Sequence, residues 1–121
     1  MTRINVGVHP SELTDKHLLA EHREIKRVPN VVKSGRFSLV GQPTSFTLGT
    51  GHVKFFYDKL GHLKLRYQQI HAECVKRGFN VTDFTSAFDH VPKEYMKDYK
   101  PTERDRRIIM QRISERLKEM T

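Results

Sequence analysis

The sequence has a single cysteine, Cys74, and no tryptophan. One thiol cannot form an internal disulfide, and it cannot supply the several cysteines of a thiolate zinc site. No apolar run approaches the length of about 18 residues that a membrane-spanning helix needs. The opening residues MTRINVGVHP lack the apolar core of a signal peptide. These absences exclude a secreted disulfide-bonded mini-protein and a membrane span, and we expect a cytoplasmic protein.

Acidic residues are also few relative to basic ones. Lys and Arg together number 22 against 14 Asp and Glu, so the net charge is +8 and the pI is about 9.8. Such a balance is typical of proteins that bind nucleic acid or another anionic surface. The chain of 121 residues has no internal repeat, linker or low-complexity tract. It can bury a core without covalent staples, so residues 1–121 are predicted to form a single domain.

No stretch alternates apolar and polar residues over the length of a useful strand, whereas three segments have helical periodicity. They are Ser11–Arg27, His52–Arg77 and Thr102–Glu119, with Gly78 as the stop signal of the second. The prediction is an all-α, compact three-helix domain with long irregular connections. The longest connection is Val28–Gly51, which the turn LGTG closes. The expected inward faces of the second and third helices are formed by Val53, Phe56, Tyr57, Leu60, Leu63, Tyr67, Ile70 and Cys74, and by Ile109, Ile113, Leu117 and Met120.

The first of these helices, with Ser11 as its expected N-cap, has a cationic side. At about 3.6 residues per turn, Lys16, Arg23 and Arg27 fall on one stripe. One interpretation is a solvated basic face whose charges have partners at helical spacing. The other is a surface that grips phosphates.

One carboxylate lies beside this stripe. Glu24 and His17 are at the border between the cationic side and the apolar side, which is formed by Leu18, Ile25 and Val28. A carboxylate held among cations is expected to be ionised at neutral pH, which suits it to stabilising a developing positive charge. The seven histidines show no spacing with cysteine or acids that predicts a metal site.

Four segments of the chain occur together and in order: MTRIN at 1–5, LLAEHREIKRV at 18–28, FTLGTGHVKFFYDKL at 46–60 and ECVKRGFN at 73–80. In this combination the chain resembles the endonuclease V family of phage pyrimidine-dimer DNA glycosylases with abasic-site lyase activity, from Met1 to about Glu119. The resemblance implies a single α-helical domain and double-stranded DNA with a lesion as the partner. It also implies that no metal or organic cofactor is needed. We expect a monomer, in a bacterium or a phage-infected host cell.

The resemblance also implies roles for individual residues. Family members break the bond between sugar and base with the α-amine of the residue after the initiator Met, which here is Thr2. Their catalytic acid matches Glu24. With the nearby cations added, the residues expected to contact DNA are Arg3, Lys16, His17, Arg23, Arg27, Lys33 and Arg36.

The chain departs from the family pattern in several places. It has one extra residue near His9–Pro10, Lys16 where the family has glutamine, His22 where it has tyrosine, and a shorter connection after the first helix. No aromatic residue follows Tyr99, whereas the family uses an aromatic tail at the lesion. The substrate therefore stays open between an ultraviolet dimer, an abasic site and another damaged base.

An amine must be neutral to attack a sugar. An α-amine has a reference pKa of about 8, against about 10.4 for lysine, so it supplies far more free base at neutral pH. Because Thr is small, removal of Met1 is expected, and neighbouring arginines would lower the pKa of the exposed amine further. Two alternatives are a non-catalytic DNA-binding module and a metal-dependent nuclease. The second would need an acidic or histidine cluster that the sequence does not show.

Overall fold

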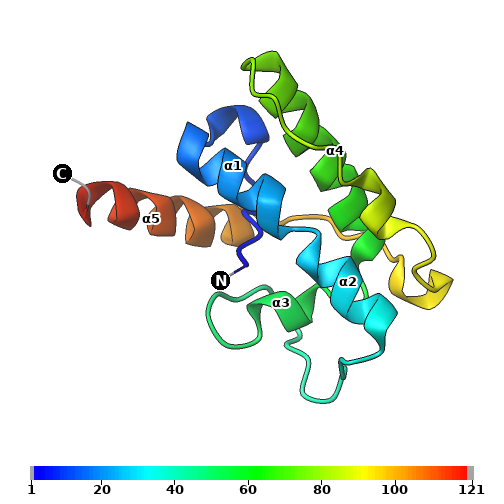
Figure 1. Ribbon diagram of the computed structural model, residues 1–121. Coiled ribbons are helices and arrows are strands. Elements are labelled where there is room, and N and C mark those ends of the chain that lie inside the picture. The colour runs from blue at the N-terminus through cyan, green and yellow to red at the C-terminus, as the bar shows by residue number, and fades with distance from the viewer. Residues whose placement is uncertain (1, 120–121) are drawn as a thin grey trace.

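The computed structural model describes residues 2–119, and the regular structure in this part of the chain is helical (Figure 1). The predicted all-α class is confirmed. None of the described helices combines the length and apolar character needed to cross a bilayer. The α-helices are α1 (Asp15–Glu24), α2 (Arg27–Ser34), α3 (His52–Phe55), α4 (Leu60–Lys76) and α5 (Glu103–Glu119), and the 3-10 helices are η1 (Pro10–Glu12), η2 (Thr85–Phe88) and η3 (Lys93–Tyr95).

The helix α4 forms the centre of the core. It packs against α1, η1 and η2, and its Leu60, Leu63 and Ile70 are completely buried. Cys74 is buried on the same helix, as its position in the apolar pattern predicts. Each such side chain contributes about 1.5–3 kcal/mol by leaving water. The N-terminal segment 2–8 lies alongside, with Ile4, Asn5, Val6 and Val8 buried, and in Figure 1 it enters the fold between α1 and α5.

The predicted first helix is in fact two helices, and it begins later than expected. Ser11 lies in η1, and the N-cap of α1 is Thr14, whose Oγ1 accepts the backbone N–H of His17 at 3.2 Å. The helix stops at Glu24 and a second one begins at Arg27. Pro29 explains the break, because it has no N–H to donate and its ring clashes with the carbonyl four residues earlier. In the first turn of α2 the same proline is tolerated, so part of the expected loop is helical.

The predicted second helix is also divided, by a turn between α3 and α4. The backbone carbonyl of Asp58 in this turn accepts the N–H of Lys97 at 3.2 Å, which draws a distant segment against the break. At Gly61 a Cβ atom would lie 2.5 Å from the carbonyl oxygen of Met96, so only glycine permits this approach. Sequence periodicity carries no information on such a contact, and the interruption was therefore missed.

Two other helix ends lie where they were predicted. After α4, the N–H groups of Gly78 and Phe79 donate to the carbonyls of Val75 and Cys74, with Gly78 in the left-handed region at φ 84°. Before α5, Thr102 and Asp105 exchange side-chain to backbone hydrogen bonds of 3.1 and 3.0 Å. Of the expected inward face of α5, Ile109 and Ile113 are buried, Leu117 is 41% exposed, and Met120 is outside the described residues.

Candidate active site

The N-terminal segment is held by buried polar groups from three different elements. The backbone N–H of Ile4 donates to Nε2 of His52 at 2.8 Å, and the side-chain amide of Asn5 donates to Glu21 at 2.7 Å. The carbonyl of Val8 accepts from Arg66 at 2.8 Å. Buried backbone groups must find partners, so these contacts fix the path of the chain start across the inner face of α1.

Glu21 anchors this arrangement through a buried ion pair with Arg66. Nε of Arg66 donates to one carboxylate oxygen at 2.5 Å and Nη2 to the other at 3.0 Å, in the bidentate form that arginine favours. Glu21 is 2% exposed and Arg66 is 5% exposed. The pair joins α1 to α4 beneath the N-terminal segment.

Glu24 lies one turn further along α1 and on the same face. It is 8% exposed, yet it makes no hydrogen bond or ion pair with another described residue. At this end of the helix, Nη1 of Arg27 donates to Oγ1 of Thr2 at 3.5 Å. The structure therefore brings Thr2, Arg3, Glu24 and Arg27 together, although Arg27 belongs to α2 and not to the same helix as Glu24.

Arg3 is the electrostatic centre of this cluster. Its pKa is lowered, first by partial burial and then by the charges of Arg112 and Arg116, while Glu24 opposes the shift. Arg112 and Arg116 are on α5 and were not among the predicted site residues. Because they are four residues apart, both lie on one face of a helix. This spacing is the sequence feature from which a basic surface on α5 could have been predicted.

His17 is a further residue on which Arg3 acts electrostatically. Its Nδ1 is 2.6 Å from Oγ1 of Thr14. Burial lowers the pKa of His17, and the nearby Arg3, Arg116 and Lys16 lower it further. His17 is therefore largely uncharged at neutral pH, and it offers hydrogen-bonding groups and not a positive charge.

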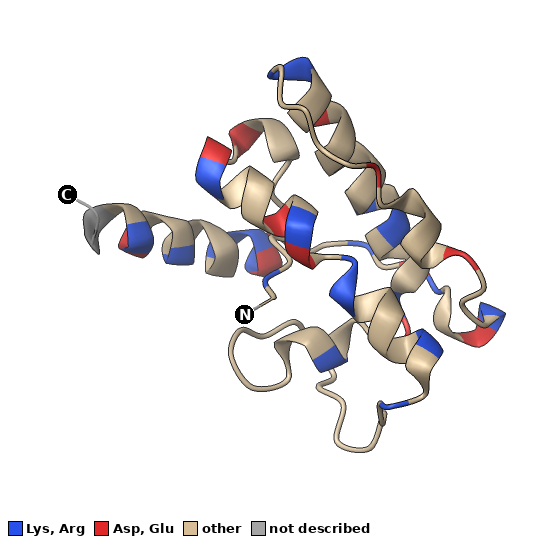
Figure 2. Cartoon of the chain, viewed as in Figure 1, with Lys and Arg blue, Asp and Glu red and all other residues tan. Residues whose placement is uncertain are grey.

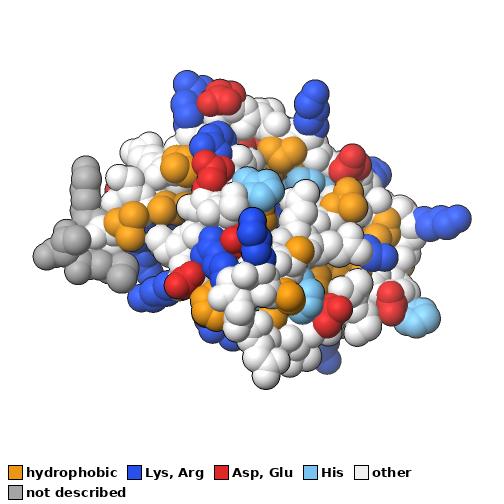
Figure 3. All heavy atoms as spheres, turned by 90° about the horizontal axis from the view of Figure 1, so that it is seen from above, with side chains coloured by type: hydrophobic (Ala, Val, Ile, Leu, Met, Phe, Trp, Pro, Cys, Tyr) orange, Lys and Arg blue, Asp and Glu red, His pale blue; other side chains and the backbone are white. Residues whose placement is uncertain are grey.

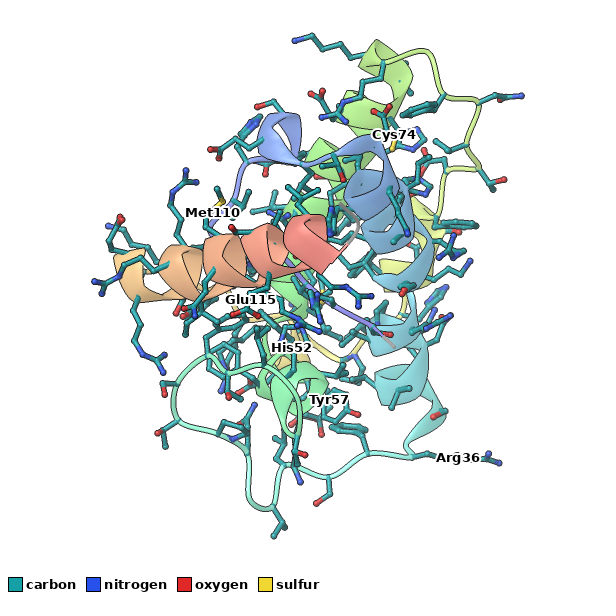
Figure 4. All side chains as sticks on the ribbon, turned by 90° about the vertical axis from the view of Figure 1, so that its left-hand side faces the viewer. Arg36, His52, Tyr57, Cys74, Met110 and Glu115 are labelled. Carbon is teal, nitrogen blue, oxygen red and sulfur yellow. The ribbon has the colours of Figure 1, made fainter. Side chains whose placement is uncertain are left out.

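The remaining predicted cations are spread more widely. Figure 2 shows basic segments at the end of α1 and the start of α2, and others spread along α5. Lys16 and Arg23 are exposed on α1, whereas Lys33 and Arg36 are exposed at the opposite end of α2 from Arg27. In Figure 4, Arg36 projects from the edge of the molecule, far from the labelled His52 in its interior. Seen from above, the basic side chains are interspersed with acidic and histidine side chains (Figure 3).

The family model for pyrimidine dimer DNA glycosylases matches residues 1–86 of this chain. The chain belongs to that family. The match identifies the protein as a DNA glycosylase, a class of enzyme that acts in DNA repair. It also indicates DNA with pyrimidine dimers as the substrate class. The matched segment contains Thr2, Arg3, Glu21, Glu24, Arg27 and His52, and it ends before α5.

The glycosylase has few other places for chemistry in its described part. Within residues 2–119, no group of three or more His, Cys, Asp or Glu side chains lies close enough together to hold a metal ion. His22 is buried on the face of α1 near α4, where its Nε2 lies 3.0 Å from the Tyr67 hydroxyl and 3.2 Å from Nδ1 of His71. That cluster is part of the packing between helices and does not reach the N-terminal segment.

Proposed function

We propose that the glycosylase works through the α-amine of Thr2, set free by removal of Met1. The amine attacks the anomeric carbon of the damaged nucleotide, the bond from that carbon to the base breaks, and the base leaves with the bonding electrons and a proton. Loss of water is not needed, because the sugar ring opens to give an imine between Thr2 and the sugar. The observation that supports this proposal is that Glu24 is buried near Arg3, accepts no hydrogen bond from a described residue, and lies at the helix end where Arg27 contacts Thr2.

Glu24 has two roles in this scheme. Its carboxylate stabilises the positive charge that develops on the sugar, where a fixed charge in a dry site acts strongly. It then assists removal of the proton next to the imine carbon, and the 3′ phosphate leaves by β-elimination. Water finally hydrolyses the imine and releases the enzyme. Apart from this water molecule, each step uses groups of the chain and the DNA.

The basic side chains supply the binding energy. Extrusion of a nucleotide costs a few kcal/mol, least at a lesion, and phosphate contacts offset it. Arg3 and Arg27 are the cations nearest the proposed nucleophile, Lys16 and Arg23 are exposed along α1, and Arg112 and Arg116 extend this surface onto α5. His17 adds a hydrogen-bonding group, and Lys33 and Arg36 lie at the periphery of the same DNA contact. The enzyme acts as a monomer.

Borohydride reduction during turnover tests the proposal, because it converts the imine into a stable protein–DNA adduct. We expect adducts on duplexes with either a pyrimidine dimer or an abasic site. Thr2→Ser, which keeps a small residue with a free amine, should still form them. Thr2→Leu, whose bulk prevents removal of Met1, should bind DNA without an adduct. Intact binding with no adduct from the native protein would leave a non-catalytic module as the explanation.

A further inference from the structure

The ring of His52 has a defined protonation state and orientation. Its Nε2 accepts from the backbone N–H of Ile4, and its Nδ1 lies 2.8 Å from the carbonyl oxygen of Thr47. A carbonyl only accepts and a backbone N–H only donates, so Nδ1 carries the proton and Nε2 does not. His52 is therefore neutral, and each of its two nitrogens has one partner from a different part of the chain.

The surroundings hold this ring rigidly. His52 is 4% exposed and lies edge-on to Phe46 and Phe56, with ring centroids 5.4 and 5.6 Å away. Burial lowers the pKa of His52, so the acceptor on Nε2 persists at neutral pH. In Figure 4 the ring lies in the interior, below α5.

Ile4 is two residues from Thr2. Nearer the chain start, the anchor is the long 3.5 Å contact between Thr2 and the exposed side chain of Arg27. The hydrogen bond to His52 is thus the first short, buried contact of the described N-terminal segment. Only two peptide units separate it from the amine, so displacement of Ile4 is passed on to Thr2.

We propose that His52 is a positioning residue for the nucleophile, which it aligns through the N–H of Ile4. This inference rests on the proposed function of Thr2. Misplacement of a reacting group by about 1 Å is enough to slow a reaction about a hundredfold. Loss of the acceptor should therefore slow imine formation and leave DNA binding intact, because no basic side chain is altered.

Three variants separate positioning from simple packing. His52→Phe keeps an aromatic ring but has no acceptor for Ile4. His52→Gln has a donor and an acceptor spaced about like the two ring nitrogens. Phe46→Leu loosens the packing around His52 and keeps both of its hydrogen bonds. The measurements are the rate of borohydride trapping on abasic DNA, the Kd for the same duplex and the Tm.

We expect trapping by His52→Phe to be about 10–100-fold slower than in the native protein, with Kd changed less than about threefold. His52→Gln should recover part of the rate, and Phe46→Leu should lower Tm at near-native rate. An equal slowing in Phe46→Leu and His52→Phe at equal loss of Tm would overturn the positioning role. So would native trapping by His52→Phe. If the native protein itself forms no adduct, the proposed function fails instead.

A spectroscopic measurement on the native protein covers the case in which His52→Phe does not fold. Nitrogen-15 NMR should show a protonated Nδ1 and an unprotonated Nε2 in His52, with coupling across the hydrogen bond from the Ile4 amide. In His52→Gln the Thr2 and Arg3 signals should shift together with a several-fold slower trapping rate. A protonated Nε2 in the native protein would overturn the assigned hydrogen bond to Ile4. The positioning role would also be overturned if the spectra of His52→Gln showed that the Ile4 hydrogen bond is lost while trapping stays at the native rate.

Discussion

The inner face of α1 has two regions, each with one buried carboxylate, and they differ in what surrounds it. Both oxygens of Glu21 are occupied, one by Asn5 and Arg66 and the other by Arg66 alone. Glu24, one turn away, makes no hydrogen bond or ion pair with another described residue, and Arg3 is the described residue whose pKa it raises. A buried carboxylate that accepts no hydrogen bond is costly. Glu21 holds the fold together, whereas Glu24 makes no such contact, which suits the catalytic role that we propose for it.

The largest effect that this difference predicts is on activity. Glu24→Gln keeps the shape of the side chain and removes its charge, so the developing cation on the sugar loses its stabilisation. We expect turnover on dimer-containing DNA to fall about 10²–10⁴-fold through kcat. Binding of the duplex, measured by fluorescence anisotropy, should be retained. Native turnover in this variant would remove Glu24 from the mechanism.

The companion change at the other region should act on stability. Glu21→Gln leaves the guanidinium of Arg66 buried opposite a neutral amide, and breaking such a pair costs about 3–5 kcal/mol. Urea denaturation should therefore show a much lower midpoint for Glu21→Gln than for Glu24→Gln, which we expect to stay within about 1 kcal/mol of the native protein. Similar losses of stability in the two variants would mean that the two carboxylates do not differ in role.

The sequence predicts one of these two regions much better than the other. Glu24 was predicted from its place beside a cationic stripe and from the resemblance of LLAEHREIKRV to a known family. Glu21 belongs to the same string, yet nothing local indicates that it is buried. Its partner Arg66 is 45 positions away on a helix whose apolar pattern does not mark it. Long-range polar contacts leave no periodicity, so the residues that hold the site were missed.

The fold was predicted in the same uneven way. The helical class, the burial of Cys74 and the ends at Gly78 and Thr102 follow from local rules of periodicity and capping. The break between α1 and α2 also has a local cause, which is Pro29. The apolar pattern runs through this break, however, and a proline at this point predicts the start of a loop and not of a second helix. The break before Gly61 depends on a carbonyl from residue 96, and no local rule contains that contact.

A smaller effect separates the cations near Thr2 from those at the far end of α2. Neutralising one phosphate contact lowers the slope of log affinity against log salt by about 0.9. We expect that decrease for Arg112→Gln, because Arg112 lies close enough to Arg3 to lower its pKa. Arg36→Gln should change the slope less. Titrations of one duplex across salt concentrations measure the slope for each variant. Equal decreases of the slope in Arg112→Gln and Arg36→Gln would mean that the DNA contact extends along the whole of α2.

The smallest effect is a pH dependence that distinguishes two histidines of α1. Burial lowers the pKa of His22, with help from His71 and Lys26 and against Asp83, and burial also lowers the pKa of His17. The unfolded chain therefore binds more protons than the folded one just below pH 6.5, so stability is greatest above about pH 6.5 and falls as the pH drops toward 5. Carboxyl groups with a lowered pKa, such as Glu12 with a pKa of about 2, affect the pH dependence of stability only at more acidic pH.

Thermal melts measure this dependence, and the Tm of the native protein should fall by several degrees between pH 7.5 and 5. The loss of Tm should be smaller in His22→Gln, whose histidine is 3% exposed, than in His17→Gln, whose histidine is only half-buried. An unchanged slope in His22→Gln would show that the inner face of α1 does not set the acid limit of the fold.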